Sequence, residues 1–133
     1  MIQHIDLQAI LRRSVSEMYR DLVTRPTGKA VRTSIEAELR LTADAPVLAV
    51  VDFTGVGCVD HSCADEIVAK LLLAGYGYFV FRGLNDTHRD ALEPVLEHHG
   101  LIIAVDEGDG RLDLFGAAPD EARAAFQAMQ RGG

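Results

Sequence analysis

The stretch that decides the fold is Val47-Leu48-Ala49-Val50-Val51-Asp52-Phe53, an almost uninterrupted apolar run rich in valine. This composition is typical of a strand that is buried on both faces, as in a parallel sheet. Gly55-Val56-Gly57 ends the run, and Asp60-His61-Ser62 then precedes a second apolar run, which has helical spacing and stops at Gly75. The sequence therefore predicts a strand, a loop at its carboxyl end, and a helix.

Downstream of this unit the pattern alternates between strand and helix. Buried strands are predicted over residues 76–81 and 101–105, with a helix over 85–99 between them. Asp109-Gly110 is a hairpin signal, so we expect residues 111–115 to return as an antiparallel strand.

Side-chain alternation in the returning strand predicts that Leu112 and Leu114 face the core, while Arg111 and Asp113 face solvent. Pro119-Asp120-Glu121 then opens a closing helix, because acidic residues in a first turn suit the helix dipole.

The residues before the deciding strand have helical spacing. Apolar residues three or four apart predict one helix over 5–22, with Asp6 as its N-cap. Pro26 disfavours helical geometry at the residue before it, so a second helix is expected over 29–41. Residues 42–46 are expected to be a connector.

Together these elements predict a single α/β domain over 1–133. We expect a mostly parallel central sheet of about four strands with helices packed on it, an antiparallel hairpin at 101–115, and extra N-terminal helices. In chain order this gives an N-terminal helical segment over 1–43, an α/β core over 45–116 and a C-terminal helix over 118–131.

Composition narrows the range of partners. The 133 residues are 48% hydrophobic, which suits one domain with a core. Lys and Arg number 13 against 20 Asp and Glu, for a net charge of −7, which argues against nucleic acid as a partner. We see no signal peptide and no apolar run long enough for a bilayer, so we expect a cytoplasmic protein with no membrane partner.

The charge is unevenly divided along the chain. Residues 1–41 hold seven basic and five acidic side chains, whereas residues 42–133 hold six basic and fifteen acidic ones. A basic front on an acidic body would allow two copies to associate as a homodimer. The alternative is that these charges are solvated helix faces.

The polar residues after the deciding strand carry a resemblance to a known family. The order strand, Asp52-Phe53-Thr54-Gly55-Val56, then Val59 to Glu66, then apolar helix is similar to the STAS domain, the fold of anti-sigma-factor antagonists. Ala64-Asp65-Glu66, with residues 24–29 upstream, resembles more closely a bacterial STAS-like group of unassigned function. This resemblance implies a regulatory, protein-binding module that needs no cofactor.

The resemblance also implies roles for individual residues. Ser62 matches the serine that partner kinases phosphorylate, and Asp60 matches the family's aspartate. His61 stands where the family has its first serine, and Cys63 stands where it has glycine. The partner implied is a histidine-kinase-like ATPase or an anti-sigma factor, bound through residues around Ser62, namely Asp60, His61, Cys63, Asp65 and Glu66.

A phosphate on Ser62 is compatible with the local physics. It would lie at a helix N-terminus, where the dipole favours negative charge, and it would repel Asp60 and Asp65. The alternative is that Ser62 or Asp60 caps the helix and does nothing more. Upstream, Arg25, Thr27 and Lys29 lie around the start of the second predicted helix, where they could hold an anion; the alternative is a turn rich in Pro and Gly.

Two other chemistries use the same loop. Zinc would need a second ligand pair, and only His98-His99 is available; neighbours on a helix point to different faces, so no metal site is expected. An enzyme or small-ligand protein could instead use Asp60-His61-Ser62-Cys63, with Cys63 as a reactive thiol. Cys58 is expected to be a small core hydrophobe.

Overall fold

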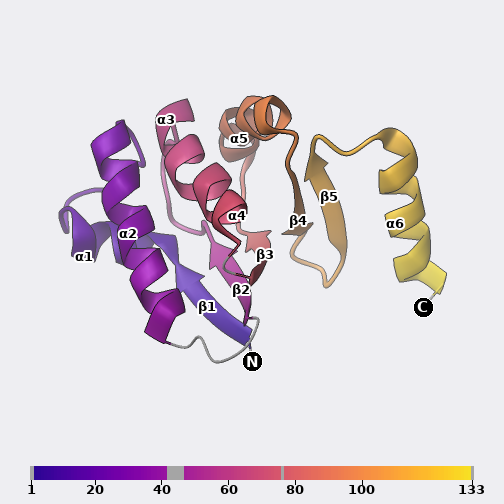
Figure 1. The fold of residues 1–133 in the computed structure, drawn as a ribbon, viewed down its shortest axis with the longest axis horizontal. Coiled ribbons are helices and arrows are strands. Elements are labelled where there is room, and N and C mark those ends of the chain that lie inside the picture. Colours follow the sequence, from indigo (N-terminus) through magenta and orange to yellow (C-terminus); the bar gives the residue numbers. More distant parts are fainter. Residues whose placement is uncertain (1, 42–46, 76, 133) are drawn as a thin grey trace.

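A computed structural model describes residues 2–41, 47–75 and 77–132 (Figure 1). The expected connector at 42–46 and the expected strand start at Tyr76 lie outside the described residues. Among the described residues, no helix combines the length and the apolar composition needed to cross a membrane.

The centre of the fold is a five-stranded sheet in which each strand lies beside the next one in the sequence. The first four strands are parallel, and the last is antiparallel to its neighbour. This confirms the α/β class, the mostly parallel sheet and the hairpin, but the sheet has one strand more than the four expected. The strands are β1 (Ile2–Asp6), β2 (Val47–Asp52), β3 (Gly77–Arg82), β4 (Ile102–Asp106) and β5 (Leu112–Gly116).

In the described part of the chain, five α-helices lie between these strands, and a sixth follows the last strand. They are α1 (Leu7–Ser14), α2 (Arg25–Leu41), α3 (His61–Ala64), α4 (Lys70–Ala74), α5 (Asp86–His99) and α6 (Asp120–Gly132). A π-helical turn, η1 (Asp65–Ala69), joins α3 to α4, so residues 61–74 form one continuous helical segment. As predicted, this segment ends at Gly75, whose φ of 72° places it in the left-handed region.

The helices between parallel strands share one face of the sheet, because parallel crossovers are right-handed and the strand order never reverses. In chain order, α2, the α3–η1–α4 segment and α5 pack against one another, and Figure 1 shows α2 and α4 side by side over the strands. The core lies between this helical layer and the sheet, where Ile5, Val51, Phe81 and Val105 are buried.

The opposite face of the sheet is less covered. Along each parallel strand, buried residues alternate with residues that are half-buried or exposed. We call this second surface the open face; its apolar residues include Ile2, Leu48, Val50, Tyr78, Val80 and Ile102. The composition of the deciding strand, β2, predicted burial on both faces, but only one of its faces is buried.

The N-terminal segment differs from the expected helix over 5–22. Residues 2–6 form a strand that pairs with β2, and Ile5 lies opposite Val51. Asp6 does cap α1, as predicted, by accepting a hydrogen bond from the backbone N–H of Ala9 at 3.2 Å. However, α1 ends at Ser14, and Met18 farther along the apolar spacing is 87% exposed. The segment 1–43 is thus not helical throughout, and its first residues belong to the sheet.

The second helix starts earlier than the prediction of residue 29. Arg25 opens α2, and Pro26 lies in its first turn, where the missing N–H of proline removes no helical hydrogen bond. The chain turns into α2 at Thr24, whose φ of 72° is unusual for a residue with a side chain.

The returning strand β5 presents its faces differently from the prediction. Phe115 pairs with the buried Ile103 and is itself buried under the helical layer, so Leu112 and Leu114 lie on the other face and remain half-buried. The alternation was correct, but the larger Phe115 determines which face is the core.

Helix α6 lies beside β5, at the end of the sheet (Figure 1). The side-chain amide of Gln130 pairs with the backbone of Leu112: it accepts from the Leu112 N–H at 2.7 Å and donates to the Leu112 carbonyl. Arg123 donates to the carbonyl of Gly116 at 3.2 Å. These contacts satisfy backbone groups along the edge of the sheet, which would otherwise be available to another strand.

Candidate functional site

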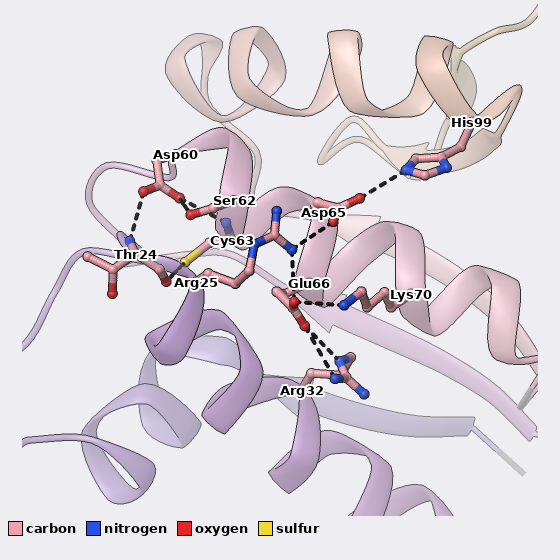
Figure 2. A network of polar contacts seen from close by, with 10 residues as sticks. All are labelled: Thr24, Arg25, Arg32, Asp60, Ser62, Cys63, Asp65, Glu66, Lys70 and His99. Carbon is pink, nitrogen blue, oxygen red and sulfur yellow. Dashed lines mark hydrogen bonds and ion pairs between the residues drawn. The ribbon is translucent and has the colours of Figure 1, made fainter.

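The site is organised around the carboxylate of Asp60, the N-cap of α3 (Figure 2). One oxygen, Oδ1, accepts from the backbone N–H of Cys63 and from the hydroxyl of Ser62, each at 2.8 Å. The other oxygen, Oδ2, accepts from the backbone N–H of Thr24 at 2.7 Å. A single side chain therefore caps one helix and also holds the turn that precedes another.

Backbone pairing places Thr24 within reach of Asp60. Leu22 donates from its N–H to the carbonyl of Cys58 at 2.8 Å, and Asp60 donates from its N–H to the carbonyl of Leu22 at 3.0 Å. Leu22 and Val59 thus form an isolated parallel bridge, which extends the strand-like pairing beyond the end of the sheet. Because Leu22 is fully buried, this pairing is anchored in the core.

The hydrogen bonds on Asp60 favour its charged form. Burial by itself would raise the pKa of this carboxyl, but the N–H groups of Thr24 and Cys63 and the Ser62 hydroxyl outweigh burial and lower the pKa below its ordinary value. Asp60 is therefore a carboxylate at neutral pH, and any second negative charge placed beside it would be repelled.

Ser62 lies at the edge of a broad surface depression of about 610 Å³. Its side chain is half-buried and points toward Asp60. Three separated parts of the chain line this depression, with residues Arg25, His61, Ser62, Asp65, Pro94, Val95, His98 and His99. The start of α2, the start of α3 and the end of α5 meet here.

Arg25, at the start of α2, points toward Asp65 and Glu66 (Figure 2). Its Nη1 donates to Asp65 Oδ2 at 2.9 Å and to Glu66 Oε1 at 2.8 Å. The other oxygen of Asp65 lies 2.9 Å from Nε2 of His99. The hydrogen bond from Arg25 is the main reason why the pKa of Asp65 lies below its ordinary value; burial opposes this, and His99 adds to it.

Glu66 is buried beneath the surface of the site, with 3% of its side chain exposed. Three cations surround it: Arg25, Arg32 at 3.2 Å, and Lys70 at 2.7 Å. Burial would raise the pKa of Glu66, but the hydrogen bonds from Lys70, Arg25 and Arg32 outweigh burial and lower it. The carboxylate lies in the π-helical turn, and it joins α2 to the α3–η1–α4 segment.

Cys63 is fully buried, and its thiol donates to the carbonyl of Thr24 at 3.1 Å. Burial, with the nearby Asp60 carboxylate, raises the pKa of this thiol to about 12. A thiol in this state is a poor nucleophile, because the thiolate is the reactive form. Cys58, which we expected in the core, is exposed because it lies in the loop before α3 rather than on a core-facing strand.

The structure separates the predicted site residues into two groups. Ser62, His61 and Asp65 line the depression, and Asp60 bonds to Ser62 from the side. Cys63 and Glu66 are buried below them and do not face solvent. They support the surface and do not form part of it.

The site also includes residues that the sequence pattern did not reveal. His99 pairs with Asp65 although 34 positions separate them, and no local spacing indicates this contact. A second depression of about 310 Å³ lies beside Thr24 and is lined by the exposed apolar residues Met18, Tyr19 and Val23.

Among the described residues, no group of three or more His, Cys, Asp or Glu side chains is placed to hold a metal ion. His98 and His99 contact each other as rings and are exposed on α5, whereas Cys63 is buried. Compared with models of protein families, with curated proteins and with solved structures, the chain matches none.

Proposed function

We propose that the chain is a regulatory protein-binding module of STAS-like type, and that phosphorylation of Ser62 switches its binding surface. The observation that supports this most directly is the position of the Ser62 hydroxyl. It donates to the Asp60 carboxylate at the edge of a depression that also holds the Arg25 guanidinium. The proposal also rests on the resemblance of residues 52–66 to STAS domains.

A phosphate on Ser62 would change two contacts at once. Esterification removes the hydroxyl proton that Asp60 now accepts and places a second anion beside this carboxylate. Asp60 also holds the Thr24 N–H, so repulsion at Asp60 would act on the turn that opens α2. The phosphate would therefore alter the relation between α2 and α3 at the surface.

Arg25 would respond to the same phosphate. It is half-exposed, with 51% of its side chain accessible, and its bonds to Asp65 and Glu66 are made through Nη1. Its other guanidinium nitrogens are free to rotate with the group toward a new anion, and arginine binds phosphate with favourable geometry. Movement of Arg25 would leave Asp65 with His99 as its remaining partner.

The proposed contact surface combines the edge of this depression with the neighbouring apolar loop. His61 and Asp65 supply polar contacts, while Met18, Tyr19 and Val23 supply apolar area on the other side of Thr24. Apolar residues surrounded by polar ones are typical of protein-binding surfaces. We propose a histidine-kinase-like ATPase or an anti-sigma factor as the partner.

The alternative of an enzyme that uses the Asp60-His61-Ser62-Cys63 loop has less support. Its reactive group would be the Cys63 thiol, which is buried and has a raised pKa. A small ligand in the depression is still compatible with Arg25 and His61, but it would bind without help from that thiol.

The test is affinity capture from a lysate of the native host with wild-type, Ser62→Ala and Ser62→Asp chains as baits. Thr87→Asp is the matched control, because Thr87 also occupies the second helical position and donates to its own N-cap, Asn85, at 2.6 Å. A kinase-like or anti-sigma protein bound by wild type and Thr87→Asp but lost with Ser62→Asp would support the proposal. The captured kinase should then phosphorylate wild type and not Ser62→Ala.

Equal capture of such a protein by all four baits would keep the binding function and reduce Ser62 to part of a helix cap. Failure of every bait to bind a regulatory protein, together with retention of a small molecule, would favour the alternative and would argue against the proposal.

A further inference from the structure

The open face of the sheet is an unpartnered apolar surface. Tyr78 is 72% exposed, Ile2 58% and Ile102 44%, although all three lie within strands. Leu48 and Val50 between them are half-buried. The helical layer contributes nothing here, because its crossovers all lie on the other face.

The size of this surface is that of a protein interface. The four parallel strands, about 4.8 Å apart and about 17 Å long, present roughly 330 Å² in projection. The accessible area of a face covered by side chains is larger than its projection, and stable complexes bury about 800 Å² on each partner. The open face is thus large enough to form most of such an interface, and it is larger than the scattered apolar residues of an ordinary surface.

The register divides the open face into rows of different chemistry. At the amino ends of the parallel strands lies an apolar row with Ile2, Leu48 and Tyr78 side by side. A middle row contains Val50 next to Val80. At the carboxyl ends the same face becomes charged.

The charged row has alternating signs at its centre. Asp6, Asp52, Arg82 and Asp106 occupy adjacent strands at the same height. Arg82 lies between two of these acids, and its Nε is 3.8 Å from Asp52 Oδ2, which is longer than a hydrogen bond. Both side chains keep accessible area, 47% for Arg82 and 33% for Asp52, so both can contact a partner.

We propose that a second copy of this chain covers the open face, in a symmetric dimer whose two-fold axis runs parallel to the strands between β2 and β3. This axis keeps every residue at its height and exchanges β2 for β3 across the interface. Asp52 of each copy then faces Arg82 of the other, Leu48 faces Tyr78, and Val50 faces Val80. The two sheets would pack about 10 Å apart.

The chemistry of the rows favours this axis over one that runs across the strands. A two-fold axis across the strands would reverse the heights and set the charged row of each copy against the apolar row of the other. Asp52 and Arg82 would then be desolvated against Leu48 and Tyr78 without partners, which is strongly unfavourable. Of these two axes, the parallel one gives both apolar and ionic complementarity, and it does so twice by symmetry.

At the rim of this arrangement β1 faces β4, so that Ile2 meets Ile102 and Asp6 approaches Asp106. Among the described residues of the charged rows, these two acids form the like-charged pair that faces across the interface. Each already accepts a backbone N–H, from Ala9 and Gly108 respectively. Their repulsion at the solvated rim is screened by salt, so the dimer should tighten as salt rises from a low level.

The first test is sedimentation equilibrium of the full chain across a range of concentrations. Wild type should approach twice the mass of one chain, and Tyr78→Glu should raise the dissociation constant at least tenfold. Leu73→Glu is the control, because Leu73 is 59% exposed on α4, on the helical side. Circular dichroism confirms that each variant is folded, and Ile102→Glu replaces Tyr78→Glu if that variant unfolds.

The second test exploits the proposed exchange of charges. Arg82→Asp alone places two acids opposite each other, and Asp52→Lys alone places two bases opposite each other, so each variant should be monomeric by itself. Mixed in equal amounts, the two variants should form a heterodimer, because both contacts then join opposite charges. This recovery depends on the axis and does not depend on Ser62.

A wild-type chain that stays monomeric up to about 1 mM, the limit of weak association, would overturn the proposal. So would a dimer that Leu73→Glu breaks and Tyr78→Glu leaves intact. A dimer that Tyr78→Glu breaks while the mixed charge variants fail to associate would overturn the proposed axis.

Discussion

Gly28 of α2 lies so close to Cys63 of α3 that a Cβ on Gly28 would stand 3.0 Å from the Cys63 Cα. The same Cβ would also stand 3.0 Å from the Cβ of Glu66. The two helices meet backbone to backbone at this point, and this contact brings Arg25 and Thr24 to the residues around Ser62. The glycine is needed for close approach, since its φ is not in the left-handed region.

Gly28→Ala should therefore destabilise the protein by about 1 to 3 kcal/mol, the usual cost of overpacking, although alanine is otherwise the better helix former. Urea unfolding followed by circular dichroism measures the difference. Ala37→Gly at an exposed position of the same helix is the control and should cost about 1 kcal/mol for the opposite reason. A Gly28→Ala variant as stable as wild type would contradict the close contact.

Glu66→Gln should lower the free energy of unfolding at pH 7 by about 2 kcal/mol, because Arg25, Arg32 and Lys70 lose the charge that they share. The pKa of Glu66 is lowered in the folded protein, so on acidification the unfolded chain binds the proton first. The stabilisation by the Glu66 carboxylate is thus complete at neutral pH. It is lost as the pH falls below about 4.5, the ordinary pKa of a glutamate, and through the lower pKa of the folded state.

Unfolding curves of wild type and Glu66→Gln should accordingly converge between neutral and strongly acidic pH. Glu93→Gln, at an exposed position of α5, should differ from wild type by less than about 0.5 kcal/mol. A difference between wild type and Glu66→Gln that is independent of pH would show that the charge of Glu66 is not what stabilises the fold.

Two N-cap aspartates allow a direct comparison of local and long-range roles. Asp6→Ala removes one cap bond, to Ala9, and should cost about 1 kcal/mol. Asp60→Ala removes its cap bond and also the bonds from Thr24 and Ser62, so it should cost about 2 to 3 kcal/mol. Thermal unfolding of both variants measures this, and equal losses would mean that the bond to Thr24 contributes no stability.

The two thiols should react at very different rates. Cys58 is exposed and should be modified by a thiol reagent in the native protein, whereas Cys63 should react only as the protein unfolds. Mass spectrometry of the labelled chain identifies the modified residue. Labelling of Cys63 under native conditions as fast as that of Cys58 would contradict its burial and would reopen the thiol chemistry.

Much of the fold is encoded in local signals. The valine-rich run predicted β2, Gly75 and Gly100 end their helices in the left-handed conformation, and Asp109-Gly110 lies in the β4–β5 turn. Each of these signals acts within a few residues, so the sequence alone is sufficient to predict these elements.

The errors arose where tertiary contacts decide the structure. β1 lies at the edge of the sheet and contains the polar residues Gln3, His4 and Asp6, so it lacks the apolar run that identified β2. Pro26 argued against a helix at Arg25, yet the first helical turn accommodates proline. The contact between Asp60 and Ser62 is local, since they are two residues apart, but the contacts of Asp60 and Asp65 with Thr24, Arg25 and His99 join distant parts of the chain.

The pairing of Gln130 with the backbone of Leu112 has a consequence for how the protein stays in solution. A bare outer strand can recruit strands from other molecules and begin to form fibrils. By imitating a neighbouring strand with one side-chain amide, α6 occupies the backbone of β5 at Leu112 and so protects this edge of the sheet. A fragment that stops before residue 120 would lose this protection, and its shortened chain should gel or precipitate on storage, with a rise in thioflavin fluorescence.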